Sequence, residues 1–259
     1  MSANTGKYAS VNGLRVYYEV RGEGRPLVLL HGGVTTIEMT FGDLVASFAE
    51  HHQVIAIDLQ GHGRTADTDR EMSLPALADD VVTLLAQLDI DQADFFGFSL
   101  GALVSFTIAM RYPNVVHKLV LASANYRPEG YDNDRRDTDP AEVERRMPTP
   151  ADFQQMRDAY EAVAPHPEHF DALAEKTSTM VHSFPGFEPD ALRTITAPTL
   201  LVFGDTDFTP LRNAVEMLDL IPNAQLAVLP GTTHMGVTRS GERLRALIEP
   251  FLGDGDGRP

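Results

Sequence analysis

Six short apolar runs alternate along the chain with segments of helical periodicity. The runs are Pro26 to Leu30, Val54 to Ile57, Phe95 to Phe96, Leu119 to Ala122, Leu200 to Phe203 and Leu226 to Leu229. A short continuous apolar run is typical of a strand that is covered on both faces. Apolar residues keep helical spacing from Leu74 to Leu88, after the potential N-cap Ser73. This alternation predicts an α/β fold, with a mostly parallel sheet and helices on both faces.

Two segments depart from this alternation. The segment from Tyr8 to Val20 predicts a hairpin, because two strand-like runs flank the turn at Asn12-Gly13. The segment from 125 to 196 is rich in proline and charge, and it carries helical patterns without a strand signal. The segment is too long to be a plain loop. We therefore predict a core domain of residues 1–124 and 197–259 and an inserted helical lid of residues 125–196. A decorative surface insertion is the alternative.

A serine flanked by two glycines stands where a strand meets a helix. The stretch Gly97-Phe98-Ser99-Leu100-Gly101 follows one apolar run and precedes another. Such a turn holds the serine in a strained conformation and lifts its hydroxyl clear of the sheet. The glycines are needed because strand and helix pass too close together for side chains. A free serine hydroxyl is a poor nucleophile, so this interpretation requires a base and an acid elsewhere in the chain.

Composition narrows the possible partners. The 259 residues carry 37 acidic and 21 basic side chains, for a formal net charge of −16. An acidic surface repels phosphate backbones and anionic membranes, so neither nucleic acid nor a membrane is an expected partner. The absence of cysteine excludes disulfides, thiolate catalysis and cysteine-based metal sites. The polar stretch Met1 to Lys7 lacks the apolar centre of a signal peptide, which predicts a cytoplasmic location.

These motifs resemble the α/β-hydrolase superfamily, in particular its small capped serine esterases and lactonase-like members. The resemblance covers nearly the whole chain and implies a triad in the order serine, acid, histidine. It implies that Ser99 is the nucleophile and that the acid follows the strand ending at Phe203. Asp205 and Asp207 compete there, and the family's usual spacing after Gly204 favours Asp207. Some relatives carry the acid after the strand ending at Ala122, but no carboxylate follows in Ser123, Ala124 and Asn125.

The resemblance also implies the base and the oxyanion hole. His234 would be the base, in a loop between the last strand and a terminal helix from about Arg239. The backbone N–H groups of Leu100 and Gly33 would form the oxyanion hole, with Val34 as the alternative to Gly33. His31 is interpreted as a structural residue. The stretch from Asp58 to Arg64 resembles another family landmark that shapes a loop. Neither a cofactor nor a metal site is predicted.

The leading hypothesis is a hydrolase that cleaves a small-molecule carboxylic ester or lactone through an acyl-serine intermediate. A carbon–carbon bond hydrolase and a cofactor-free perhydrolase would use the same triad, and a ligand-binding or ring-forming protein on this fold is an alternative of another class. The natural substrate, the substrate-binding residues and the oligomeric state are not predicted. Apolar side chains of the predicted lid could line an acyl pocket or form the lid's own core: Met147, Phe153, Met156, Tyr160, Met180, Phe184 and Phe187.

Overall fold

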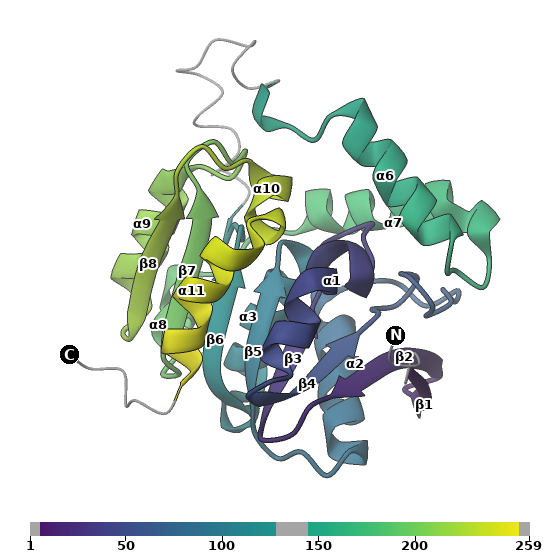
Figure 1. The fold of residues 1–259 in the computed structure, drawn as a ribbon, viewed down its shortest axis with the longest axis horizontal. Coiled ribbons are helices and arrows are strands. Elements are labelled where there is room, and N and C mark those ends of the chain that lie inside the picture. Colours follow the sequence, from purple (N-terminus) through teal and green to yellow (C-terminus); the bar gives the residue numbers. More distant parts are fainter. Residues whose placement is uncertain (1–5, 128–144, 254–259) are drawn as a thin grey trace.

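Eight strands form one sheet in the order β1-β2-β4-β3-β5-β6-β7-β8 (Figure 1). The computed structural model describes residues 6–127 and 145–253, except for the side chain of Asp43. The strands are β1 (Lys7–Val11), β2 (Leu14–Arg21), β3 (Arg25–Leu30), β4 (His52–Ile57), β5 (Ala93–Phe98), β6 (Val116–Ala122), β7 (Thr199–Gly204) and β8 (Ala224–Leu229). Each predicted apolar run lies within one of these strands, so the strand predictions are confirmed.

Strands β3 to β8 run in parallel, whereas β2 pairs antiparallel with both of its neighbours, β1 and β4. Strands β1 and β2 form the predicted hairpin. Its turn residues Asn12 and Gly13 both have positive φ, at 47° and 85°, as the tight turn of a twisted hairpin requires. The α/β prediction is confirmed. Because β3 to β8 run in parallel, their carboxyl ends meet at one edge of the sheet, where α/β proteins place their sites.

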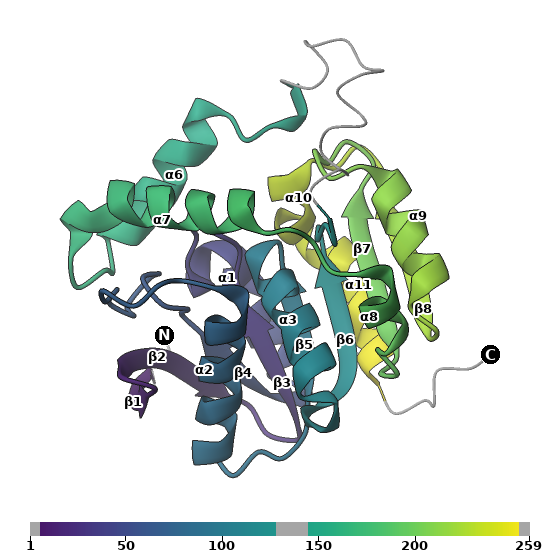
Figure 2. The same ribbon diagram turned by 180° about the vertical axis from the view of Figure 1, so that it is seen from behind.

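Helices cover both faces of the sheet. Helices α1 (Ile37–Phe48) and α11 (Gly241–Leu252) lie on the face toward the viewer in Figure 1. On the opposite face, shown in Figure 2, lie α2 (Leu74–Gln87), α3 (Leu100–Arg111) and α9 (Leu211–Leu220). Helix α2 begins as predicted, since the hydroxyl of Ser73 accepts from the N–H of Ala76 at 3.3 Å. The central strand β5 is buried along its whole length.

The segment between β6 and β7 contains α6 (Pro150–Glu161), the single turn η2 (Pro167–His169), α7 (Phe170–Ser183) and α8 (Pro189–Arg193). Both views show α6 and α7 lying across the carboxyl ends of the strands. Helix α8 instead lies beside α9, and its Leu192 is buried in the main core. Residues 128–144 of the predicted lid lie outside the described residues. The boundaries of the two domains therefore stay a prediction.

Two polar connections tie α6 and α7 to the core. Arg239 donates to Asp152 at 2.8 Å and to Gln155 at 2.9 Å, both on α6. Lys176 on α7 forms an ion pair of 2.7 Å with Asp67, in the loop after β4. The two connections hold the helical pair at two places over the sheet edge. None of the helices in residues 6–127 and 145–253 has the length and apolar character that crossing a bilayer demands.

Candidate active site

Ser99 lies in a strained turn between β5 and α3. Its φ of 52° and ψ of −113° are unfavourable for a residue with a side chain, at a cost of about 1–3 kcal/mol. The backbone N–H of Ser99 donates to Ala122 at 2.9 Å, which fixes the turn against β6. A Cβ at Gly97 would overlap the backbone of Gly101, and a Cβ at Gly101 would overlap the carbonyl of Leu30. The two glycines thus allow the close approach that the sequence predicts.

The imidazole of His234 connects Ser99 to Asp207. Its Nε2 lies 3.1 Å from Ser99 Oγ, and its Nδ1 lies 2.9 Å from Asp207 Oδ1. The hydroxyl of Ser99 does not cap its own helix, so it is available to the imidazole. Both His234 and Asp207 are buried. The structure therefore brings the three predicted triad residues into one hydrogen-bonded chain.

Asp207 and Asp205 have different surroundings. Burial alone would raise the pKa of Asp207, but the adjacent His234, the Ser123 hydroxyl and the Thr209 N–H outweigh it and lower the pKa. Asp205 is exposed and accepts from the backbone N–H of Thr232 at 3.1 Å. Asp207 is thus kept ionised beside the imidazole, whereas Asp205 supports the loop that leads to His234.

His234 is the first residue of a helix and not a loop residue. Helix α10 (His234–Arg239) begins after Thr233, whose hydroxyl accepts from the N–H of Gly236 at 3.3 Å. The prediction of a loop histidine before a helix from about Arg239 is therefore wrong in this detail: α10 comes first and α11 begins at Gly241. The helix fixes the backbone of His234 at the carboxyl edge of the sheet.

Two aromatic rings enclose the imidazole. The ring of Phe208 stacks on His234 with 4.0 Å between centroids, and the ring of Phe98 lies 5.0 Å away at a tilt of 43°. Phe208 follows Asp207 directly, and Phe98 precedes Ser99. These two neighbours in sequence thus restrict rotation of the imidazole and shield its hydrogen bonds from water.

Polar side chains that the sequence analysis did not identify lie behind the acid. Ser123, at the end of β6, has a φ of 54°, and its hydroxyl contributes to the lowered pKa of Asp207 although its geometry falls short of a hydrogen bond. Within the described residues, several buried side-chain atoms in the segments after β6 and β7 have no hydrogen-bond partner: Ser123 Oγ, Asp207 Oδ2, Thr209 Oγ1, Asn213 Oδ1 and both amide atoms of Asn125. Buried polar groups of this kind are usually satisfied by ordered water. Only the pairing of β6 with β7, which brings the ends of these two strands together, could have indicated these side chains.

The two predicted oxyanion donors lie side by side. A Cβ built at Gly33 would lie 3.9 Å from the Cβ of Leu100. The N–H of Leu100 belongs to the first turn of α3, where no intrahelical acceptor is available. Val34, the alternative donor, has a φ of 54°, so the loop turns sharply directly after Gly33. The arrangement leaves both Gly33 and Val34 open as the second donor.

His31 supports this loop and takes no part in the hydrogen-bonded chain. Its Nε2 accepts from the N–H of Leu59 at 3.0 Å, and its Nδ1 lies 2.8 Å from the carbonyl of Gly32. Burial and the neighbouring His62 lower the pKa of His31 to about 3. Its ring lies 5.0 Å from that of His62, in the loop after β4. The neutral imidazole thus joins the loop after β3 to the loop after β4.

The apolar side chains of the predicted lid have three different environments. Met156 and Tyr160 are buried and belong to the same continuous core as the sheet residues, and Tyr160 packs edge-on against Phe170. Met147 and Phe153 are exposed. The other three, Met180, Phe184 and Phe187, line a cavity of about 430 Å³ between α7, α2 and α3. None of the predicted triad residues lines this cavity.

Helix α7 covers Gly33, one of the two predicted oxyanion donors. The methyl group of Thr177 would lie 3.1 Å from a Cβ at Gly33, and its hydroxyl lies 3.9 Å from the sulfur of Met72. Met72 is also part of the cavity wall. Thr177 and Met72 thus lie between the cavity and Gly33. The residues that bind substrate stay unassigned.

The chain is similar to proteins of known and unknown function. An uncharacterized protein of Mycobacterium bovis is 33% identical over 118 residues, which cover 46% of this chain and 34% of the relative. The match thus spans about a third of that relative's length. The 2-hydroxy-6-oxo-6-(2'-aminophenyl)hexa-2,4-dienoic acid hydrolase of Metapseudomonas resinovorans is 24% identical, with 97% of this chain and 92% of the relative covered.

Structural similarity extends over the whole chain. A solved N-acyl homoserine lactone degrading enzyme matches with a TM-score of 0.73 and 25% identity, over 95% of this chain and 100% of that one. A family model described as the alpha/beta hydrolase fold matches residues 25–237, which include Ser99, Asp207 and His234. With its sheet order and its strained serine turn, this chain belongs to the alpha/beta hydrolase fold family.

Proposed function

We propose that this protein is a serine hydrolase that cleaves a carboxylic ester or a lactone through an acyl-serine intermediate. The observation that carries the proposal is the hydrogen-bonded chain Ser99–His234–Asp207 at a strained strand–helix turn. This constellation makes a serine nucleophilic near neutral pH.

In the acylation step, His234 Nε2 takes the proton of Ser99 as Oγ attacks the carbonyl carbon. The developing oxyanion lies between the N–H groups of Leu100 and of Gly33 or Val34. Asp207 stabilises the imidazolium that forms, and His234 returns the proton to the leaving alcohol oxygen. In a lactone that oxygen stays attached to the acyl group, because the ring opens without releasing a fragment.

In the deacylation step, a water molecule replaces the alcohol. His234 takes a proton from water, the hydroxide attacks the acyl carbon, and Ser99 leaves with the proton that His234 returns. The lowered pKa of Asp207 keeps its carboxylate charged in both steps. The similarity to the N-acyl homoserine lactone degrading enzyme supports a neutral ester-type bond as the target.

Carbon–carbon bond hydrolysis is the second candidate. It is favoured by the match of 97% of this chain to a relative named as a hydroxy-oxo-dienoic acid hydrolase. A serine triad and an oxyanion hole serve that reaction as well, so the triad geometry alone does not separate the two substrates.

Steady-state kinetics test the proposal. The full chain is assayed with p-nitrophenyl esters of increasing acyl length, a series of neutral lactones and a 2-hydroxy-6-oxo-dienoate. We expect the ester or lactone series to give the highest kcat/KM, and a serine-directed organophosphonate to label wild type but not Ser99→Ala. Preferred turnover of the dienoate would establish the second candidate. Absence of both labelling and turnover would contradict hydrolysis.

A further inference from the structure

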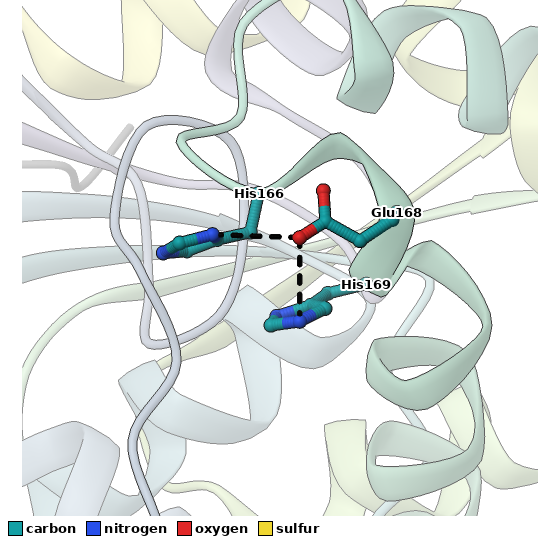
Figure 3. Close-up of side chains that lie close together, drawn as sticks. All are labelled: His166, Glu168 and His169. Atoms are coloured by element: carbon teal, nitrogen blue, oxygen red, sulfur yellow. Dashed lines mark ion pairs between the residues drawn. The ribbon is translucent and has the colours of Figure 1, made fainter.

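A cluster of two histidines and a glutamate lies far from the triad, at the turn between α6 and α7. Figure 3 shows His166, Glu168 and His169 on one side of η2, with the glutamate carboxylate next to both imidazoles. One carboxylate oxygen, Glu168 Oε1, lies 3.6 Å from His166 Nδ1 and 3.6 Å from His169 Nε2. The three ligand atoms all lie within 4.8 Å of one another. Among the described residues, this is the group of histidines and carboxylates with the spacing of a metal site.

The backbone explains why the two imidazoles lie together. His169 N–H donates to the carbonyl of His166 at 3.0 Å, which is the bond of a 3₁₀ turn. Side chains three residues apart in such a turn are eclipsed. The two rings accordingly stack, with 5.0 Å between centroids and 22° between planes. The sequence spacing of the two histidines and the turn type thus place both rings on the same side.

The turn is held in place before any ligand binds. Pro165 and Pro167 flank His166 and restrict the backbone on both sides. The buried Tyr160 donates from its hydroxyl to the carbonyl of His166 at 3.2 Å. Tyr160 also packs on the ring of Phe170, which directly follows His169. A ligand therefore meets a preorganised turn and does not have to order it, which lowers the entropic cost of binding.

The geometry fits a tetrahedral ion of zinc size. Two ligand atoms bound to zinc at about 2.1 Å lie about 3.4 Å apart in a tetrahedron. Both distances from Glu168 Oε1 are close to this value. Because the two rings are stacked, at least one must turn before both nitrogen lone pairs point at the same ion, and side chains that are more than half exposed are free to do so. Two imidazoles and one carboxylate suit Zn²⁺, whereas Ca²⁺ and Mg²⁺ prefer oxygen ligands alone.

We propose that His166, Glu168 and His169 form a Zn²⁺ site on the turn between α6 and α7. Solvent provides the fourth ligand, because the cluster is open to water. The formal net charge of −16 raises the local concentration of cations. The sequence analysis predicts no metal site. The stretch from His166 to His169, with two histidines three residues apart and a glutamate before the second, is the pattern that could have indicated it.

Calorimetric titration of the untagged, chelator-treated full chain with ZnCl₂ tests the site. We expect one Zn²⁺ per chain in wild type. The His166→Ala and His169→Ala variants should each bind more than about tenfold more weakly, since even indirect partners of a metal contribute that much. Glu168→Gln should also weaken binding. His182→Ala is the matched control, because His182 is an exposed histidine on α7 outside the cluster, and it should bind as wild type does.

Hydrogen exchange gives a second readout that does not depend on activity. Zn²⁺ should slow exchange of the amides of His166 and of residues 168 to 170 in wild type and in His182→Ala, but not in His169→Ala. Three results would overturn the proposal: no binding to wild type, binding that persists in both histidine variants, or equal weakening in His182→Ala. Binding with unchanged exchange in this turn would place the ion elsewhere and contradict the site.

Discussion

The ring of Phe208 lies parallel to the imidazole of His234, with 4.0 Å between centroids and 27° between planes. Phe208 follows Asp207 directly, so the loop that carries the acid also carries the ring that packs on the base. Phe208 thus acts as a positioning residue for the imidazole, because a ring that rotates breaks its bond either to Ser99 or to Asp207.

Replacement of Phe208 should lower kcat more than it changes KM. We expect Phe208→Ala to reduce kcat about tenfold or more, since small misplacements of catalytic groups are costly. Phe208→Tyr keeps the ring and should stay close to wild type. Steady-state kinetics on one ester measure both. A rise of KM alone in Phe208→Ala would indicate that the ring binds substrate instead.

Ser99 combines chemistry with backbone strain, so its variants should separate the two. Both Ser99→Ala and Ser99→Gly should fall below about a thousandth of wild-type turnover. Only glycine tolerates the φ of 52° without strain, so Ser99→Gly should be more stable than Ser99→Ala by on the order of 1 kcal/mol. Urea unfolding at one pH measures the difference. Equal stabilities would show that the turn is not strained.

The two aspartates of the loop after β7 should have unequal effects. Asp207→Asn removes the partner of the imidazolium and should lower kcat by about 10⁴. Asp205 is exposed and binds backbone only, so Asp205→Asn should cost less than about tenfold. Parallel kinetics of both variants decide this. The reverse ranking would place the acid at Asp205.

Stability should fall as the pH drops below about 6.5, because two histidines are buried in neutral form. Burial is the main cause that lowers the pKa of His31 to about 3 and of His62 to about 4, whereas both titrate near 6.5 in the unfolded chain. The unfolded state therefore binds protons that the folded state does not. The stabilisation is complete above pH 6.5 and is lost as the pH falls toward the folded values.

Between pH 6.5 and 5.5 the two histidines together should cost on the order of 2 kcal/mol of unfolding free energy. Urea unfolding at both pH values measures the loss. Protonation of the buried Asp58, whose pKa burial raises to about 7, stabilises the folded state over the same range and offsets part of this loss, so the variants are compared with wild type. His62→Asn should lose about 1 kcal/mol less than wild type, and the exposed His182→Ala should lose as much as wild type. Equal losses in wild type and His62→Asn would mean that His62 is not neutral in the folded state.

The strands were predictable from the sequence because a strand covered on both faces must be apolar throughout. Asp207 was predictable only through the resemblance, whose usual spacing after Gly204 favours it over Asp205. The side chains that surround Asp207 were not predictable from the sequence. Ser123 reaches Asp207 only because β6 lies beside β7, and sheet order is a property of the whole fold. The pairing of His234 with Ser99 likewise required a resemblance, since 135 positions separate them.

The start of α10 escaped prediction for a local reason. Thr233 caps the helix, but the position three residues later is Gly236, and not the glutamate or glutamine of a capping box. Helix α8 has only five residues and too few apolar positions for a periodic pattern. The apolar residues of α6 were ambiguous in the same way, since Phe153 has the helical spacing of Met156 and Tyr160 and is nonetheless half exposed.

Helix α10 begins with His234 and ends with Arg239, which binds α6. Six residues of helix span about 9 Å, too short a length to bend. The imidazole of His234 and the anchor of α6 therefore lie on one short element, and a movement of α6 can reach that imidazole through the half-exposed side chain of Arg239.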